Sequence, residues 1–306
     1  MNRERQKLAT QVAALVLAAV ALALLVFRLA VYEAPAASGA AAAGPAPADA
    51  PVRAVVVSVE GDVQRGSANG WSSVAPGQTV RRDEVLRTGA NSRTDLTIGQ
   101  RSHLTLGASS EVRIQELTGM VHRFRLTRGQ MTADYEAEGA RVLRVEDGTG
   151  EAVAEARSAR FSVLSTGTSI AVATSQGEVE LRSQQQAVRV ASGQESVAVA
   201  GSPPVRPTAI PTAVLLKVAN AAGASSDEVC AEVDGEAIPG SDVTVDGEPV
   251  AVGADGHFHR TVARARRKRA VLVAIRDPAG REQSRTIPCS APPAPIEEMA
   301  IRWKKP

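Results

Sequence analysis

The sequence predicts an all-β protein that follows one N-terminal apolar segment, and two observations support this fold class. First, an apolar-polar-apolar triplet recurs every eight residues, as Leu96-Thr97-Ile98, Leu104-Thr105-Leu106 and Val112-Arg113-Ile114. Such alternation places both apolar side chains of a triplet on one face of a strand. Second, no window from 53 to 200 has a convincing helical period, and in the closest, 139–159, Gly148 and Gly150 argue against a helix. The spacing is typical of a meander or of one wall of a short β-solenoid.

Composition sets broad limits on the class of protein. A chain of 306 residues is long enough for two folded domains. Aromatic residues make up only 3% of the chain, so its cores must be built from Val, Leu, Ile and Ala, which suits all-β domains. The formal charge is only +2 with acids and bases nearly balanced, so no nucleic-acid partner is expected.

The N-terminus predicts a membrane anchor. Residues 1–7 include three basic side chains and form a short cytoplasmic tail, and the uncharged run from Leu8 to Phe27 is long enough to cross a bilayer. We therefore expect residues 8–30 to be an uncleaved transmembrane helix in the inner membrane, with the bulk of the chain in the periplasm. A cleaved signal peptide is the alternative, with Ala34-Pro35-Ala36 as small residues downstream.

Composition then divides the remaining chain. Residues 31–52 are an Ala/Pro-rich tether, and turn-punctuated strands fill residues 53–200. Residues 201–212 contain four prolines and are predicted to link this block to a second β-rich block at 213–290. Residues 291–306 form a C-terminal tail.

The two cysteines, Cys230 and Cys289, fit the predicted location. Their spacing matches no zinc motif, and in an oxidising compartment they most simply form a disulfide with each other. Two unpaired buried thiols are the alternative.

The first block carries an ordered series of residues that resembles the FecR domain family over about residues 53–200. The series consists of Gly61, Trp71, Gly77, Asp83, Gly89, Gly129, Phe161, Gly177 and Gly193. Two turns depart from the family pattern, at 99–102 and 159–160. The resemblance implies structural roles for the series. Gly77 and Gly89 are expected in tight turns with positive φ, and Trp71 is expected to cap a core of small aliphatic side chains.

The second block resembles a bacterial immunoglobulin-like β-sandwich module. The resemblance rests on three segments, Ile238 to Gly247, Gly256-x-Phe258, and Val271 to Gly280. Within them, Asp246-Gly247 and the turn at 277–280 are predicted hairpin turns. The resemblance places Cys230 and Cys289 in the first and last strands of the module.

Residues able to perform chemistry are few. The chain contains no Walker loop, no Gly-x-Ser-x-Gly and no His-Glu-x-x-His, so we expect neither an enzyme nor a cofactor. His257 and His259 share one strand face and could chelate a metal, but two solvent-facing histidines beside a core Phe258 are the favoured interpretation. The isolated His103 and His122 are expected at the surface. Aromatic residues are too few for a typical sugar-binding platform.

A basic cluster is the sharpest local feature of the second block. It consists of Arg264, Arg266, Arg267, Lys268 and Arg269, at a predicted hairpin tip. The cluster could bind an anionic envelope polymer or lipid headgroups, or it could be a solvated turn that protects a strand edge from aggregation.

The FecR resemblance implies two candidate functions. The best-known family members relay a periplasmic signal to a sigma factor through a cytoplasmic domain. A tail of seven residues cannot fold as such a domain. We therefore expect a membrane-anchored, non-catalytic periplasmic binding or scaffold module whose partner is an envelope protein or a cell-wall polymer. The alternative is a signal-transduction subunit that lacks its own cytoplasmic anti-sigma domain.

Overall fold

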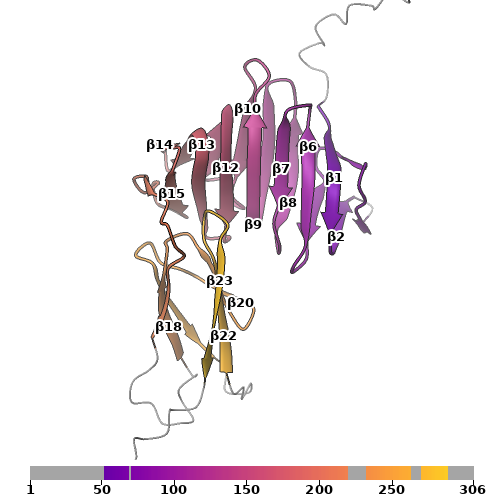
Figure 1. Cartoon of the computed structure of the whole chain (residues 1–306). Helices are drawn as coiled ribbons and strands as arrows, with labels where there is room; N and C mark the ends of the chain where they lie inside the picture. The colour runs from indigo at the N-terminus through magenta and orange to yellow at the C-terminus, as the bar shows by residue number, and fades with distance from the viewer. Residues whose placement is uncertain (1–51, 69, 220–231, 263–269, 289–306) are drawn as a thin grey trace, which may run out of the picture. The chain divides into compact units, whose positions relative to one another are not determined.

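The computed structural model describes residues 52–68, 70–219, 232–262 and 270–288. All regular elements in these ranges are β-strands, which confirms the all-β prediction for this part of the chain. The described residues form one compact unit, in which β1–β16 form a first domain and β17–β23 a second (Figure 1). In the described ranges no helix has the length and apolar character needed to cross a membrane.

Several predictions concern residues outside the described ranges. They are the tail, anchor and tether at the N-terminus, the two cysteines, the basic cluster and the C-terminal tail: 1–51, Cys230, Cys289, Arg264, Arg266, Arg267, Lys268, Arg269 and 291–306.

The first domain consists of two β-layers. The strands of the first layer, in spatial order, are β4 (Thr79–Val80), β1 (Ala54–Glu60), β6 (Arg93–Ile98), β7 (Ser102–Leu106), β9 (Val121–Glu136), β12 (Ser158–Ser165), β13 (Ser169–Ser183), β15 (Gln194–Val199) and β16 (Thr208–Ala209). Figure 1 shows β6, β7, β9, β12 and β13 side by side in this layer.

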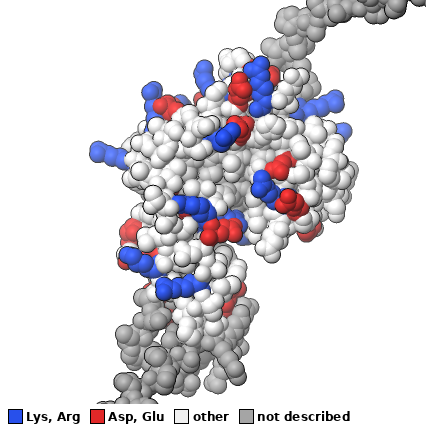
Figure 2. Space-filling view, in the orientation of Figure 1, with Lys and Arg blue, Asp and Glu red and all other residues white. Residues whose placement is uncertain are grey.

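The second layer shares two strands with the first. Its order is β3 (Gly70–Ser73), β2 (Val63–Ser67), β5 (Val85–Thr88), β8 (Glu111–Leu117), β9, β10 (Val142–Glu146), β11 (Val153–Ala156), β13 and β14 (Gln186–Ala191). Acidic and basic side chains lie beside one another on the face seen in Figure 2.

The long strands β9 and β13 join the layers, because each passes from one layer into the other at a glycine. Gly129 separates the half of β9 that pairs with β8 from the half that pairs with β12, and Gly177 marks the same passage in β13. Both have positive φ, 87° and 77°. A Cβ at Gly129 would lie 2.4 Å from the Cα of Ser110, and one at Gly177 would lie 2.4 Å from the carbonyl oxygen of Ser158. Only glycine fits both the conformation and the space.

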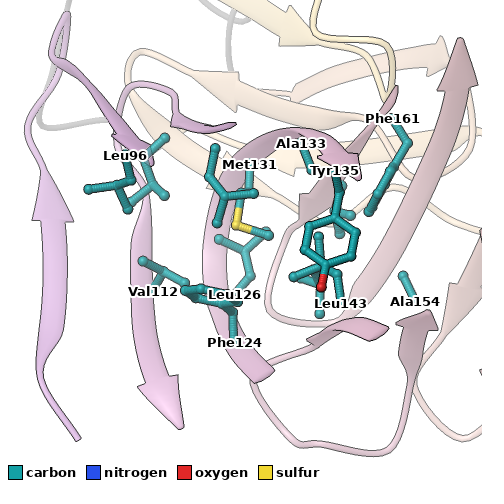
Figure 3. Close-up of a cluster of buried hydrophobic side chains, with 14 of the residues drawn as sticks. Leu96, Val112, Phe124, Leu126, Met131, Ala133, Tyr135, Leu143, Ala154 and Phe161 are labelled. Atoms are coloured by element: carbon teal, nitrogen blue, oxygen red, sulfur yellow. The ribbon is translucent and has the colours of Figure 1, made fainter. Parts of the chain in front are cut away.

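A single hydrophobic core lies between the layers. Figure 3 shows that β9 supplies side chains from both of its halves, with Phe124 and Leu126 on one side of Gly129 and Met131, Ala133 and Tyr135 on the other. All five are at most 2% exposed. Full burial of a large apolar side chain contributes about 1.5–3 kcal/mol, so this strand links the two layers energetically as well as covalently.

The triplets of the sequence do not form a solenoid wall. The first two, in β6 and β7, pair antiparallel, but the third lies in β8 of the opposite layer, where it pairs with β5 and β9. In the described part of the domain only β9 and β10 pair in parallel. The three triplets have the same apolar-polar-apolar pattern. The strands differ in layer because the segment 107–110 between β7 and β8 passes from the first layer to the second.

The predicted linker at 201–212 is partly attached to the first domain. The backbone N–H of Val205 donates to the carbonyl of Val197 at 2.8 Å, and β16 pairs with β15. This segment therefore extends the edge of the first layer.

The second domain has two small sheets around one core. Their orders are β17 (Leu216–Ala219), β18 (Glu232–Ala237), β21 (His257–Thr261), and β20 (Glu248–Val250), β19 (Asp242–Val245), β22 (Ala270–Arg276), β23 (Glu282–Pro288). Both predicted hairpin turns are confirmed: Asp246 and Gly247 connect β19 to β20 with positive φ, and the turn at 277–280 connects β22 to β23.

Candidate functional site

Trp71 lies on the outside of the first domain, so its predicted role as a cap on the core is wrong. It is 49% exposed, whereas the other described aromatic side chains, Phe124, Tyr135, Phe161 and Phe258, are at most 3% exposed. The register explains the difference. Trp71 lies directly opposite Gly66 on the neighbouring strand. Gly66 comes three residues after the inward-facing Val63, so Gly66 and Trp71 both lie on the outer face.

The ring of Trp71 is held in a defined position on this face. A Cβ at Gly66 would lie only 3.0 Å from the ring, so the indole packs closely over the glycine backbone. The guanidinium carbon of Arg87 lies 4.3 Å from the ring centroid, and Arg87 also donates to Glu111 at 2.8 and 3.1 Å. A cation over an indole is attractive by about 0.5–1 kcal/mol at an exposed site. The result is an ordered aromatic surface on β3.

Strand β3 is also an edge strand. All four of its residues are exposed, and in the described part of the chain it pairs with β2 alone. An edge strand presents main-chain groups to which another strand can add. Trp71 therefore projects beside an edge that can accept a partner.

Cross-strand ion pairs occupy much of the outer face of the second layer. Arg125 and Arg123 approach Glu146 at 3.0 and 3.6 Å, and Arg144 approaches Glu155 at 2.7 Å. Each such pair contributes at most about 1 kcal/mol at a partly exposed position. The charges of these arginines are therefore balanced by glutamates on neighbouring strands.

His122 is buried rather than exposed, contrary to the expectation from sequence. Only 1% of its surface is accessible, and its Nδ1 shares a 3.2 Å hydrogen bond with the hydroxyl of Tyr135. Burial, with a smaller effect of Arg141, lowers the pKa of His122 to about 4. Burial likewise raises the pKa of Tyr135 to about 12. Both side chains are therefore neutral at pH 7, and the pair is enclosed in the core.

The two domains meet on the outer face of the first layer. Leu164, Ala171 and Val197 form an apolar row across β12, β13 and β15 that is at most 6% exposed. Gly240 of the second domain lies against this row, since a Cβ there would be 2.7 Å from Val197 and 2.9 Å from Ala171. Ser162 donates to the carbonyl of Pro278 at 2.5 Å.

A buried group of charges lies at the same interface. Asp277 is fully buried. Its carboxylate accepts one hydrogen bond from the backbone N–H of Arg281 at 2.8 Å and one from the Nε of Arg281 at 2.7 Å. Glu195 of β15 is only 5% exposed, and its Oε2 is buried without a hydrogen-bond partner. Burial first, and then the charge of Asp277, raise the pKa of Glu195 to about 7, although Arg281 acts in the opposite direction. Sequence reasoning missed this group, because its members are far apart in the chain.

The histidine pair of the second domain has the expected placement. Phe258 is buried, and His257 and His259 are exposed on either side of it. His259 hydrogen-bonds Asp234 at 2.7 Å, and this bond raises the pKa of the imidazole. Asp234, Ala251 and the two histidines line a shallow open hollow. In the described ranges no three His, Cys, Asp or Glu residues are arranged to hold a metal ion.

The remaining residues of the resemblance have structural positions. Gly61, Gly77 and Gly193 have positive φ, as does Asp83, and Phe161 is in the core. Gly89 lies in a turn, where its carbonyl accepts the N–H of Ser92 at 3.3 Å, but the expected positive φ is wrong. A Cβ there would lie 3.3 Å from the hydroxyl of Ser92, so Gly89 and Ser92 pack closely.

The central part of the first domain matches a known protein family. Residues 84–180 match the FecR protein family. The match covers β5 to β12 and most of β13, and it includes both glycines at which strands change layers. Residues 84–180 therefore carry a FecR domain, and they lie within the longer segment, about 53–200, over which the sequence resembles this family.

Comparisons with whole proteins are less informative. Two crystal structures described as a putative anti-sigma factor from Parabacteroides distasonis are similar to the chain at 14% and 13% identity, each with a TM-score of 0.36. The match covers 41% of this chain and 59% of theirs, so the chain spans less than two thirds of that protein. No curated protein matches the chain.

Proposed function

We propose that this protein is a membrane-anchored, non-catalytic binding module of the cell envelope, in which the FecR domain presents a docking edge to a periplasmic partner. The observation that carries the proposal is Trp71, an ordered and half-exposed aromatic on the edge strand β3. The apolar segment at 8–30 supports an anchor in the inner membrane with the folded domains in the periplasm.

Trp71 and β3 together favour a protein partner. A strand that adds to β3 would gain main-chain hydrogen bonds along the edge. Tryptophan and arginine are enriched among the residues that dominate binding energy, and here Trp71 and Arg87 are already stacked on each other. Little ordering would be required on binding.

The three groups with the largest pKa shifts support a binding role rather than a catalytic one. His122 and Tyr135 are enclosed in the core of the FecR domain, and Glu195 is covered by the second domain. A general acid or base must reach its substrate within hydrogen-bond distance. A substrate cannot reach His122, Tyr135 or Glu195 in this way.

The second domain has two sheets around one core. It is proposed to be an immunoglobulin-like module.

Site-specific photo-crosslinking in intact cells tests the proposal. A photoreactive phenylalanine at position 71 of the full chain should give a specific adduct with an envelope protein. The matched control carries the same group at His103, which is exposed on the other layer of the same domain. Adducts of equal yield at both positions, or none at position 71, would refute a docking edge at β3. An adduct with cell-wall polymer at position 71 would correct the class of partner.

The FecR match favours one second candidate, a subunit that relays an extracytoplasmic cue to a sigma-factor regulatory system. The two functions differ in what the anchor must do. Replacing residues 8–27 with an unrelated transmembrane segment should leave the position-71 adduct and the function of a scaffold intact, and it should silence a relay. Capture of a membrane-bound sigma-factor regulator at position 71 would support the relay.

A further inference from the structure

The contact between the two domains depends on small residues at the centre of the interface. Ala173 and Ser162 lie on the outer face of the FecR domain, and Gly240 and Gly280 face it from the second domain. A Cβ at Gly280 would lie 2.6 Å from Nε2 of Gln130. Arg276 also donates to the carbonyl of Ala108 at 3.0 Å. The second domain therefore covers this face closely, and water is kept from the side chains beneath it.

Glu195 is a buried carboxyl group at this interface. Its neighbours across the strands are Ala173 on β13 and Thr208 on β16, and neither of them titrates. The charged groups that act on it both come from the turn after β22, Asp277 and Arg281. The cluster thus contains two carboxyl groups and one guanidinium.

The single guanidinium is directed at other groups, although its Nη2 lies close to Asp277 without forming a hydrogen bond. Arg281 binds Asp277 through Nε and through an ion pair of 2.6 Å from Nη2, and its Nη1 donates to the carbonyl of Pro211 at 2.7 Å. An ionised Glu195 would therefore be a buried negative charge next to a second one, without a donor for Oε2. A buried charge without a partner is strongly destabilising, whereas a protonated carboxyl is neutral and can donate.

We propose that Glu195 is a proton-operated clasp: the second domain stays docked on the FecR domain while Glu195 is protonated, and docking weakens when Glu195 loses its proton. The clasp is independent of the docking edge at β3. It would let envelope pH control access to the outer face of β12, β13 and β15.

The sign and size of the effect follow from linkage. The pKa of Glu195 is raised to about 7 in the docked state, and undocking returns the side chain to water, where the usual value is 4.5. The docked state therefore binds more protons, and docking is lost as pH rises through 4.5 to 7. These two values predict that the docking constant falls about 70-fold from pH 5 to pH 8. Asp242, whose pKa burial also raises in spite of nearby Arg276 and Arg128, acts with the same sign.

Thiol labelling of the full chain in detergent measures this opening. Ser162→Cys places a near-isosteric thiol beneath the second domain, and Ser73→Cys supplies an exposed thiol that corrects for the pH dependence of the reagent. Labelling at each engineered position is read by peptide mass spectrometry, so that Cys230 and Cys289 do not contribute. Ala154→Cys, in the core of the FecR domain, reports global unfolding.

The expected result is a corrected labelling rate at position 162 that rises about 70-fold from pH 5 to pH 8. Adding Glu195→Gln should reduce the change to less than about threefold, because the amide cannot ionise. Glu178→Gln, a matched change of an exposed glutamate on β13, should leave the change intact. An unchanged rate at position 162, or a full pH dependence in the Glu195→Gln background, would overturn the clasp.

A second measurement does not depend on a cysteine in the interface. The ratio of the unfolding constants of the native chain and the Glu195→Gln variant, from urea titrations, should rise about 70-fold between pH 5 and pH 8, since unfolding also exposes Glu195. A ratio that is independent of pH would refute the proposal even if Ser162→Cys disturbed docking.

Discussion

Gly129 offers the sharpest test of how β9 joins the two layers of the FecR domain. Its φ of 87° and the 2.4 Å approach of a would-be Cβ to the Cα of Ser110 both oppose a side chain. Gly193 is the matched control, because it has a φ of 79° but no atom within 4 Å of a would-be Cβ. The substitutions Gly129→Ala and Gly193→Ala therefore share the conformational cost and differ in the steric one.

The magnitude of each substitution can be worked from these contacts. A left-handed conformation costs a residue with a Cβ about 1–2 kcal/mol, which is the whole effect expected for Gly193→Ala. At Gly129 the Cβ also displaces Ser110, whose backbone N–H donates to Thr88 at 2.9 Å and whose Oγ accepts from the N–H of Gln130 at 2.9 Å. Overpacking of this kind costs about 1–3 kcal/mol and each weakened hydrogen bond about 1 kcal/mol. With both hydrogen bonds weakened, Gly129→Ala should thus destabilise the domain by about 4–7 kcal/mol.

Urea unfolding of the full chain in detergent, followed by circular dichroism, compares the two variants. The unfolding midpoint of Gly129→Ala should fall well below that of Gly193→Ala at an unchanged slope. Equal losses of stability in the two variants would show that the approach of β9 to Ser110 does not restrict residue 129, and the structural account of the layer crossing would be wrong.

Three further predictions concern other parts of the domain. The buried His122 has a pKa below that of the unfolded chain, so stability should be lost as pH falls from about 6.5 towards 4, by about 2 kcal/mol at pH 5, and His122→Gln should remove this loss in urea titrations at pH 5 and 8. Trp71→Ala should lower the free energy of unfolding by less than about 1 kcal/mol in thermal unfolding, because the ring is half-exposed. A loss above about 3 kcal/mol would show that Trp71 belongs to the core. Phe161→Ala should cost about 3–5 kcal/mol in the same assay because the ring is 1% exposed, and a loss below about 1 kcal/mol would contradict its place in the core.

Local patterns in the sequence were sufficient to predict strands and several turns. The triplets beginning at Leu96, Leu104 and Val112 are all strands with buried apolar residues, and the Asp246-Gly247 dipeptide is a hairpin turn. These features depend on alternation and backbone conformation within a few residues, so they can be predicted without the rest of the chain.

The side of the sheet on which a residue lies was harder to predict. Trp71 was expected inside and lies outside, and His122 was expected outside and lies inside. Strand pairing decides both. Trp71 lies opposite the outward-facing Gly66. His122 lies at the start of β9, and its ring meets Tyr135 from the other half of the same strand. A shift of one residue in register moves every side chain to the other face.

The sequence by itself determined that this chain is an all-β protein with a FecR-like series of glycines, since alternation and turn chemistry are encoded locally. Only the tertiary structure decided that β9 and β13 belong to both layers, and that Glu195 lies beside Asp277 and Arg281. The physical reason is that burial and charge depend on distances in space. Glu195 and Asp277 are 82 positions apart in the chain, and each becomes unusual only when folding removes both from water.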